Sequence, residues 1–450
     1  MTVETRAAEL AALDRAHLIH PLYHPKAQEG AIIFERGEGI YLWDVTGKRY
    51  LDALSGLWNV NVGHGRRELA EAARRQMEQL AFCNSYTGFA NPPAIELAAR
   101  LARLAPGDLN AVFFTSGGAE SNESAFKMAR FFWNVQGRPH KYTIISRYDG
   151  YHGVSLAAMA ATGMPNYWER FGELPPGFRH AVSPNPYRLG STPEETARLA
   201  LDSIEEIVRR EGAETIAAVI VEPIQGAGGV IIPPPQYLTG LRQLCDHYDI
   251  LLIFDEVITG FCRTGNWFAG HTFGVQADIM SFAKGVTSGY IQLGGIIISE
   301  RIRRVLAEQP VEVRWMHAYT YSAHPTACAV ALANLDIMER ERLWENAARV
   351  GAYLHRQLET LRELPHVGDV RGLGMLARVE LVQNPATKEP FPPQARVGDR
   401  VVAELRARGV VTRNRADVLC FAPPLITTEQ QVDELVGLVR EAIQAVDATL

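Results

Sequence analysis

Short apolar runs alternate with amphipathic stretches through the middle of the chain, and this alternation restricts the possible folds more than any other feature. The apolar runs, rich in β-branched and aromatic residues, are Ala111–Thr115, Tyr142–Ser146, Ile216–Val221, Ile250–Phe254 and Ile279–Phe282. Nearly continuous apolarity is typical of strands that are buried on both faces of a parallel sheet. Helical patterns lie between them, at Glu120–Trp133, Pro193–Arg210 and Pro235–His247. The alternation predicts an α/β fold with a mostly parallel central sheet flanked by helices.

The two ends of the chain differ from the middle. Residues 32–62 have the pattern of short strands and turns, whereas a long helical stretch, Ala331–Leu361, begins the C-terminal part. A strand-like segment, Gly374–Val382, and a final helix, Glu429–Ala448, follow it. We therefore predict a large domain at residues 70–325 and a smaller α/β domain built from both termini, residues 1–69 and 326–450.

The charge balance argues against several classes of partner. The 450 residues include 45 Lys and Arg against 51 Asp and Glu, a formal net charge of −6, with the two signs mixed along the chain. Because no basic stripe is present to neutralise phosphates, we expect no nucleic-acid partner and no binding to anionic membranes. The longest apolar run, Ala327–Ala333, is too short to span a bilayer, and Met1–Leu18 holds no apolar signal core.

Cysteine usage indicates a reducing compartment. The five cysteines are Cys83, Cys245, Cys262, Cys328 and Cys420, and none forms a Cys-x-x-Cys pair. A disulfide framework and a zinc site are therefore not expected, nor is any other metal site. These observations together predict a soluble cytoplasmic protein.

Chemically distinctive residues follow two neighbouring strands. Asp255 comes directly after the run Ile250–Phe254, and Lys284 follows Ile279–Phe282 between small residues. A buried acid at a strand end is unfavourable unless it meets a cation, although a helix cap or a structural ion pair would also explain it. Ligands of parallel sheets bind beyond the carboxyl ends of the strands, so Asp255 and Lys284 are expected to share one crevice.

Two further strand ends complete the candidate site. Ser116, Gly117, Gly118 and Ala119 stand between a predicted strand and a predicted helix, where bare N–H groups could hold a phosphate. A tight structural turn would explain the same residues, and no Walker or dinucleotide motif is present. Tyr151 and His152 follow the strand Tyr142–Ser146, and an aromatic there could stack on a planar ring or simply belong to the core.

One ligand would use all four features, namely pyridoxal 5′-phosphate (PLP). Lys284 would form a Schiff base with the aldehyde of PLP, and Asp255 would keep the pyridine nitrogen protonated. Residues 116–119 would bind the phosphate, and Tyr151 would cover one face of the ring.

Four spaced segments resemble the class III (omega) aminotransferase family. They are Phe254–Gly265, Ser281–Tyr290, Thr320–Pro325 and Glu222–Gly229, within a resemblance that extends from about His20 to the C-terminal helix. The resemblance implies the fold-type-I architecture of PLP enzymes and a homodimer with active sites at its interface, a dimer of dimers being an alternative.

The resemblance also implies roles for individual residues. Val257 would pack on the ring face opposite Tyr151, and Thr320 would reach the phosphate of the partner subunit's cofactor. His152 and Glu222 are further expected cofactor-binding residues. Ala119 departs from the family pattern, because many members carry a hydroxyl residue there, and backbone N–H groups would have to suffice.

A segment near the N-terminus, Leu54–Gly65, resembles the omega-amino acid or amine:pyruvate branch of the family. Expected substrate-binding residues on this basis are Leu22, Trp58, Tyr86, Tyr151 and Ala227. Arg413 matches the arginine with which such enzymes grip a substrate carboxylate, a group that a guanidinium fork fits well. The nearby Arg415 could take that role instead, and either arginine could be an ordinary surface residue.

The expected reaction is a ping-pong transfer of an amino group to pyruvate through pyridoxamine phosphate, giving an aldehyde or ketone and L-alanine. Lys284 would act as base and then acid, and Asp255 would stabilise the intermediate by keeping the ring cationic. β-Alanine, taurine, 4-aminobutyrate, diamines such as putrescine and aryl-alkyl amines all remain candidate donors. Alternatives are another PLP reaction without an oxo-acid acceptor, such as that of an aminomutase, racemase or decarboxylase, and a non-catalytic protein on an enzyme fold.

Overall fold

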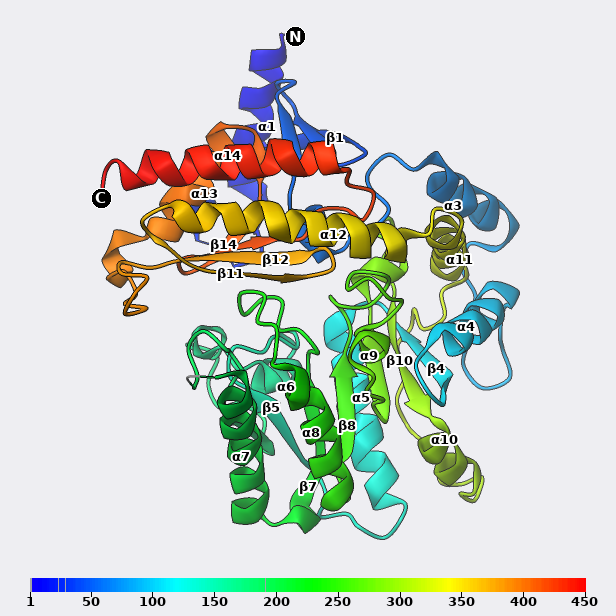
Figure 1. The fold of residues 1–450 in the computed structure, drawn as a ribbon. Helices are drawn as coiled ribbons and strands as arrows, with labels where there is room; N and C mark the ends of the chain where they lie inside the picture. The colour runs from blue at the N-terminus through cyan, green and yellow to red at the C-terminus, as the bar shows by residue number, and fades with distance from the viewer. Residues whose placement is uncertain (1, 23, 29, 191) are drawn as a thin grey trace.

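Seven strands form the central sheet, in the order β4-β10-β9-β8-β7-β5-β6 (Figure 1). The computed structural model describes residues 2–22, 24–28, 30–190 and 192–450. The strands are β4 (Leu109–Thr115), β5 (Thr143–Arg147), β6 (Phe178–Ala181), β7 (Ile216–Val221), β8 (Leu251–Asp255), β9 (Ile279–Phe282) and β10 (Gly294–Ser299). Strands β9, β8, β7, β5 and β6 are mutually parallel, whereas β10 is antiparallel to β4 and β9. The predicted mostly parallel sheet is confirmed, and it contains two strands that were not predicted: β6, at one edge, and β10, between β4 and β9.

Helices cover both faces of this sheet, as the side chains of β8 illustrate. Leu251 and Ile253 are buried in one apolar cluster with side chains of α5 (Gly118–Asn134). Leu252 and Phe254 are buried in another cluster, with side chains of α7 (Pro193–Glu211) and α8 (Pro235–His247). Successive residues of a strand point to opposite faces, so burial on both faces requires the continuous apolar run seen in the sequence.

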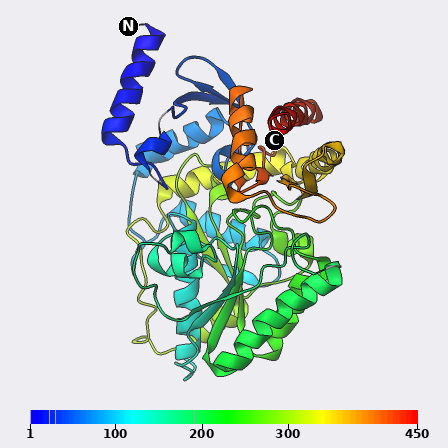
Figure 2. The same cartoon turned by 90° about the vertical axis from the view of Figure 1, so that its left-hand side faces the viewer.

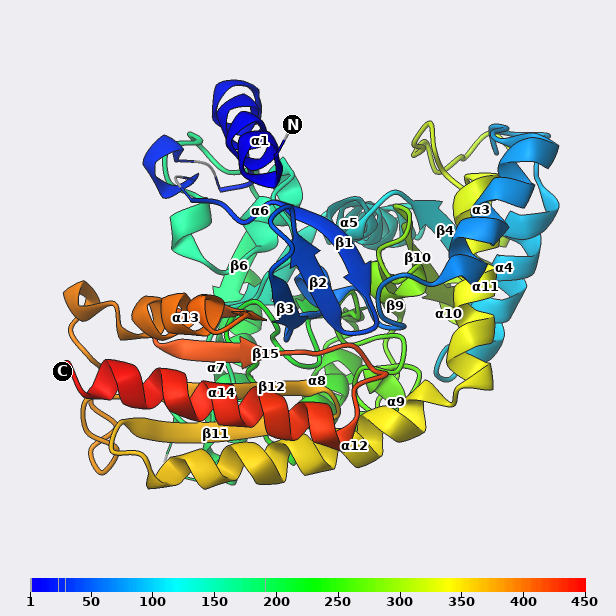
Figure 3. The ribbon, with the colours of Figure 1, turned by 90° about the horizontal axis from the view of Figure 1, so that it is seen from above.

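The N- and C-terminal parts of the chain come together above the carboxyl ends of the parallel strands (Figures 1 and 3). One sheet contains β1 (Phe34–Glu38), β2 (Tyr41–Asp44), β3 (Arg49–Asp52) and β13 (Val410–Val411), with β13 parallel to β3. A second sheet has the order β11-β12-β15-β14, formed by β11 (Val367–Leu373), β12 (Leu376–Leu381), β15 (Val418–Phe421) and β14 (Arg413–Arg415). This pairing is consistent with a domain built from both termini, whose boundaries stay a prediction.

The remaining helices lie outside the central sheet or on its flanks. They are α1 (Val3–His17), α2 (Ser55–Trp58), α3 (Arg67–Leu80), α4 (Pro92–Leu104), α6 (Leu156–Ala161), α9 (Ala269–Phe273), α10 (Glu300–Ala307), α11 (Pro325–Arg340), α12 (Leu343–Glu359), α13 (Val397–Ala407) and α14 (Glu429–Asp447). Helix α1 buries none of its side chains, and Figure 2 shows it projecting from the rest of the chain. Within the described ranges, none of the helices combines the length and apolarity needed to cross a membrane.

One prediction for the C-terminal part was wrong in detail, and two were confirmed. The single helix expected at Ala331–Leu361 is two helices, α11 and α12, because Arg342 adopts a left-handed backbone conformation (φ 49°) between them. The strand expected at Gly374–Val382 is confirmed as β12, and β11, which was not predicted, pairs antiparallel with it. The predicted final helix is confirmed as α14, which Thr428 and Gln431 begin with a reciprocal capping box.

Candidate active site

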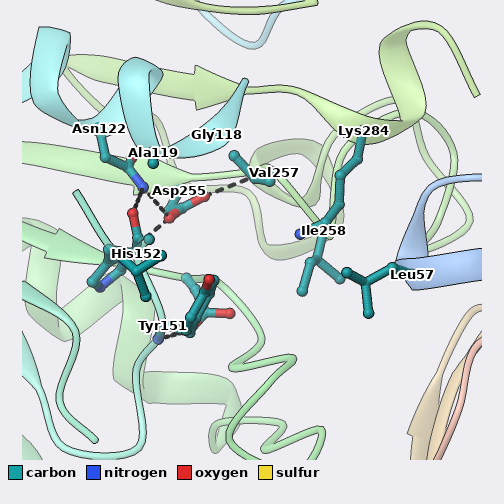
Figure 4. A pocket seen from close by; sticks show the side chains of 13 residues that line it. Leu57, Gly118, Ala119, Asn122, Tyr151, His152, Asp255, Val257, Ile258 and Lys284 are labelled. Atoms are coloured by element: carbon teal, nitrogen blue, oxygen red, sulfur yellow. Dashed lines mark hydrogen bonds and ion pairs between the residues drawn. The ribbon is translucent and has the colours of Figure 1, made fainter. Parts of the chain in front are cut away.

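Parallel pairing of β8 and β9 brings the two predicted strand-end residues to one cavity. Asp255 pairs with Ser281, so the residue three positions farther along, Lys284, lies at the same sheet edge. Both residues line a cavity of about 240 Å³, which Figure 4 shows from close by. Lys284 and Asp255 approach this cavity from different sides (Figure 4). The expectation that they share one crevice is confirmed.

Hydrogen-bond donors surround the buried carboxylate of Asp255. Its Oδ2 accepts a bond from Asn122 Nδ2 at 2.7 Å and lies 2.8 Å from His152 Nδ1. Its Oδ1 accepts the backbone N–H of Val257 at 3.1 Å. Only 3% of Asp255 is exposed, so these donors replace the water that would otherwise solvate the charge. The carboxylate is thereby held in a fixed position with its charge directed at the cavity.

Lys284 enters the cavity from a strained backbone. Its φ of 48° lies in the left-handed region, which a residue with a side chain adopts at a cost of about 1–3 kcal/mol. Burial lowers the pKa of Lys284, although the carboxylates of Asp255 and Glu222 oppose that shift. A lowered pKa increases the fraction of free amine near neutral pH, which is the form that attacks carbonyl carbons and accepts protons.

The N-terminus of α5 forms one wall of the same cavity. The first backbone hydrogen bond of the helix runs from the N–H of Ser121 to the oxygen of Gly117, so the N–H groups of Gly118 and Ala119 come before it. A side chain at Gly118 would place its Cβ 3.0 Å from a methyl carbon of Val257. The N–H of Ser116, by contrast, donates to Glu120 Oε2 at 2.8 Å. Gly118 and Ala119 therefore offer the free donors of this segment.

A buried glutamate fixes the segment that carries Tyr151. Glu222 is 3% exposed, and its two carboxylate oxygens accept the N–H groups of Tyr151 and Gly226, both at 2.9 Å. Burial raises the pKa of Glu222, and the nearby Asp255 raises it further. The ring of Tyr151 is half-buried and meets Tyr167 edge to face, with 5.6 Å between ring centroids. Tyr151 thus faces the cavity from a fixed backbone.

Only some of the predicted site residues line the cavity. The predicted residues that line it are Gly118, Ala119, Tyr151, His152, Glu222, Asp255, Val257 and Lys284. The others lie outside its lining and stay predictions: Leu22, Trp58, Tyr86, Ser116, Gly117, Ala227, Thr320 and Arg413. Leu22, Tyr86 and Thr320 are exposed, whereas Trp58 is buried in an apolar cluster behind the cavity. Arg413, on β14, is half-buried, and its charge acts on Lys284 and Tyr151.

Sequence reasoning missed several residues that line the cavity. They are Leu57, Asn122, Gly153, Val154 and Ile258. Asn122 could have been found, because it lies four residues after Gly118 and so on the same face of the predicted helix. Leu57 gave no such signal, since the adjacent tryptophan is the more distinctive residue.

The comparison with known families decides the identity. A family model described as "Aminotransferase class-III" matches residues 22–443. The chain is a class-III aminotransferase. The putrescine–pyruvate aminotransferase of Pseudomonas aeruginosa is 41% identical to it over 451 aligned positions, 99% of this chain and 98% of that protein.

Solved structures of similar proteins agree with this assignment. An (S)-enantioselective omega-transaminase from Thermomicrobium roseum has 52% identity and a TM-score of 0.95, with 98% of this chain and 99% of that chain covered. The omega transaminase of Pseudomonas jessenii in complex with PMP has 38% identity and a TM-score of 0.94, covering 97% of this chain and 98% of that one. The fold-type-I architecture that the resemblance implied is therefore confirmed.

The cofactor of this aminotransferase is PLP, and the cavity has the groups to hold it. Asp255 would supply a fixed negative charge for a protonated ring nitrogen, and Lys284 would supply an amine for an aldehyde. The free N–H groups of Gly118 and Ala119 at the start of α5 suit a phosphate. Ala119 adds no hydroxyl, so these backbone donors are the contribution of this segment. Tyr151 and Val257 line the cavity between these groups, where a flat ring would lie.

Proposed function

We propose that this aminotransferase is an omega-transaminase that moves the amino group of an amine or omega-amino acid to pyruvate. The observation that carries the proposal is that Asp255 and Lys284 line the same cavity at the carboxyl ends of β8 and β9. When bound, PLP supplies an aldehyde that exchanges amino groups and a ring that takes up electrons. The products would be an aldehyde or ketone and L-alanine.

In the proposed mechanism, Asp255 provides a stabilising charge and Lys284 transfers a proton. Asp255 would keep a proton on the ring nitrogen of bound PLP, because Asn122, His152 and Val257 fix the position of its carboxylate. Lys284, as a free amine, would act as the base that removes the proton from the donor carbon and then as the acid that returns it. Glu222 keeps Tyr151 in place through its backbone N–H.

Support for an amine donor comes from the apolar part of the cavity wall. Leu57, Val154 and Ile258 line this part of the wall. Burial of apolar surface against them would favour binding of a donor with an apolar chain or ring. The similarity to a putrescine–pyruvate aminotransferase supports pyruvate as the acceptor. β-Alanine, putrescine and aryl-alkyl amines are the donors that we propose to compare.

We propose Arg413 as the residue that binds substrate carboxylates. Arg415 forms an ion pair with Asp149, at 4.0 Å, whereas the charge of Arg413 acts on Lys284 and Tyr151 at the cavity. Arg413→Ala should therefore raise the KM for pyruvate about 10- to 100-fold, the range for a lost hydrogen bond to a charged group. The KM for benzylamine, which has no carboxylate, should change much less. Arg415→Ala is the matched control, and a larger pyruvate effect in that variant would transfer the role to Arg415.

We propose that the functional unit is a homodimer. Exposed apolar side chains gather where residues 82–89 meet residues 311–321, including Phe82 and Tyr321, whose ring centroids are 5.9 Å apart. Tyr86 and Thr320 belong to these same segments and are exposed in the single chain. An interface there would bury both residues. Sedimentation of the holoenzyme at micromolar concentration should give twice the chain mass, and a monomer would contradict the proposal.

The cysteines support the proposed cytoplasmic location. Cys245, Cys262, Cys328 and Cys420 are buried as free thiols, and Cys83 is partly exposed, also as a free thiol. Free thiols persist in a reducing compartment. Fractionation of cells that produce the full chain tests the location, and recovery outside the cytoplasm would contradict it.

The deciding experiment for the function is an absorbance spectrum of the holoenzyme, recorded alone, after an amine and again after pyruvate. We expect the visible band of the bound cofactor to fall with β-alanine, putrescine or benzylamine and to return with pyruvate, with alanine formed in equal amount. A product formed from the amine without any acceptor would instead favour a mutase, racemase or decarboxylase. No response to any of the three amines would contradict the proposal.

A further inference from the structure

A fully buried arginine, Arg263, lies behind the cavity, and no carboxylate among the residues that the structure describes forms an ion pair with it. The side chain of Arg263 is 0% exposed. Its Nη1 donates to the carbonyl oxygens of Pro423, at 2.6 Å, and Ala422, at 3.3 Å. Its Nη2 donates to Asn61 Oδ1, at 2.6 Å, and Ser55 Oγ, at 3.1 Å. Burying a guanidinium with neutral partners alone is unfavourable. The presence of such a buried charge at this position therefore calls for a functional explanation.

Of the two side chains that Nη2 of Arg263 contacts, Ser55 begins a strained turn at the cavity and Asn61 follows that turn. Ser55, Gly56 and Trp58 have φ values of 50°, 64° and 65°, all in the left-handed region. Leu57, between them, is the residue of this turn that lines the cavity. Non-glycine residues adopt such a conformation only where surrounding contacts enforce it. The bonds from Arg263 to Ser55 and Asn61 are two of those contacts.

A second buried charge holds the same turn from its other side. Asp52 is 0% exposed and accepts the N–H groups of Leu54, at 3.1 Å, and Gly56, at 2.6 Å. Burial lowers the pKa of Arg263 to about 9, and the charge of Asp52 opposes that shift. Arg263 therefore stays cationic at neutral pH. Asp52 Oδ2 also lies 2.8 Å from His64 Nε2. Both Asp52 and Arg263 thus bond to residues of the same turn.

The second set of partners of Arg263 connects the turn to the strands that carry Arg413. Ala422 and Pro423 directly follow β15, in which Cys420 pairs with Arg413 of β14. Ala422 also accepts a bond from Ser55 Oγ at 2.5 Å, and its N–H donates to Ala53 at 2.8 Å. One guanidinium group thus joins the chain segment that presents Leu57 to the hairpin that presents Arg413.

We propose that Arg263 is a positioning residue that fixes the donor-facing wall of the cavity. Its place is behind the wall, and it acts through the Leu57 turn and the β14–β15 hairpin. Because displacements of about 1 Å in an active site can change rates on the order of 100-fold, loss of this link should alter how donors of different shape are used. The statement about donors rests on the proposed function, whereas the statement about the turn does not.

The structural part of the proposal is tested on the holoenzyme by amide hydrogen exchange. Arg263→Met should speed exchange at least 10-fold in peptides covering residues 53–61 and 422–425, while peptides from β7 and β8 keep their protection. Arg263→Lys retains the charge but not the fork, so we expect a smaller change in the same peptides, and this variant decides the question if the methionine variant does not fold. Unchanged exchange in both peptides would overturn the proposal.

A second arginine provides the matched control. Arg242 on α8 pairs with Asp246 and with Asp278, which lies at the opposite end of β9 from Lys284. Arg242→Met should lower the melting temperature without changing exchange in residues 53–61. For kinetics, the ratio of kcat/KM for putrescine to that for benzylamine should shift at least 5-fold in Arg263→Lys and stay constant in Arg242→Met. Equal shifts in both variants would overturn the proposal, whereas a wild-type enzyme inactive with both amines would contradict only the proposed function.

Discussion

Replacing Lys284 by alanine should lower kcat for amino transfer from the amine to pyruvate by at least about 10⁴-fold. The reason is that, in the proposed mechanism, one side chain supplies both the amine that bonds to the cofactor and the base that moves the proton. Burial, which lowers the pKa of Lys284, makes that amine available near neutral pH. Of the described residues that line the cavity, Lys284 is the one lysine, so no second primary amine lies there to replace it. Alanine formation from pyruvate, followed over hours at high enzyme concentration, measures the loss.

The same variant should still bind PLP, because the phosphate donors at the start of α5 and the carboxylate of Asp255 are unchanged. A cofactor titration followed by absorbance measures this binding. Lys48, which bonds to backbone carbonyl groups of Arg406 and Ala407 on the surface, offers the matched control, and Lys48→Ala should keep full activity. Added methylamine should restore part of the proton transfer in Lys284→Ala. Turnover at the wild-type rate without added amine would contradict the assigned role.

The strands that carry the chemistry were the elements best predicted from sequence. Ile216–Val221 and Ile279–Phe282 have the predicted bounds in the structure, because burial on both faces leaves a continuous apolar run with distinct ends. The break between α11 and α12 gave no comparable signal. Arg342 has a side chain well suited to helices, and its left-handed conformation is imposed where α11 packs on α3 and α12 packs on β11.

The site was predictable where it depends on sheet geometry and unpredictable where it depends on distant parts of the chain. Asp255 and Lys284 were placed together because parallel neighbours end at one edge of the sheet. Arg263 gave no signal of its role, since its partners lie some 200 and 160 positions away, at Asn61 and Pro423. Thr320 and Tyr86 lie on exposed segments, so a single chain does not place them in the cavity.

Asp255→Asn should lower kcat on the order of 10²–10³-fold, the range for loss of one preorganised electrostatic contact in a closed site. The substitution keeps the shape of the side chain but removes the negative charge that holds a proton on the ring nitrogen. It also places an amide where Asn122 Nδ2 and His152 Nδ1 now approach the carboxylate, at 2.7 and 2.8 Å. Single-turnover rates with the amine alone measure the effect on the step that needs an electron-accepting ring.

One further variant separates the effect of the charge of Asp255 from that of its position, and a second variant, at Asp278, serves as a control. Asp255→Glu keeps the charge but moves it by one methylene group, so its activity should lie between those of the wild type and Asp255→Asn. Asp278 is a second carboxylate of the same sheet, paired with Arg242 at the opposite end of β9, and Asp278→Asn should reduce stability while leaving kcat unchanged. If Asp255→Asn kept the wild-type single-turnover rate, the carboxylate would be structural, and stabilisation of the reacting ring would have to come from Tyr151, His152 and the end of α5. The bonds from Asn122 and His152 argue against that outcome, because they fix the carboxylate at the cavity wall, where a protonated ring nitrogen would meet it.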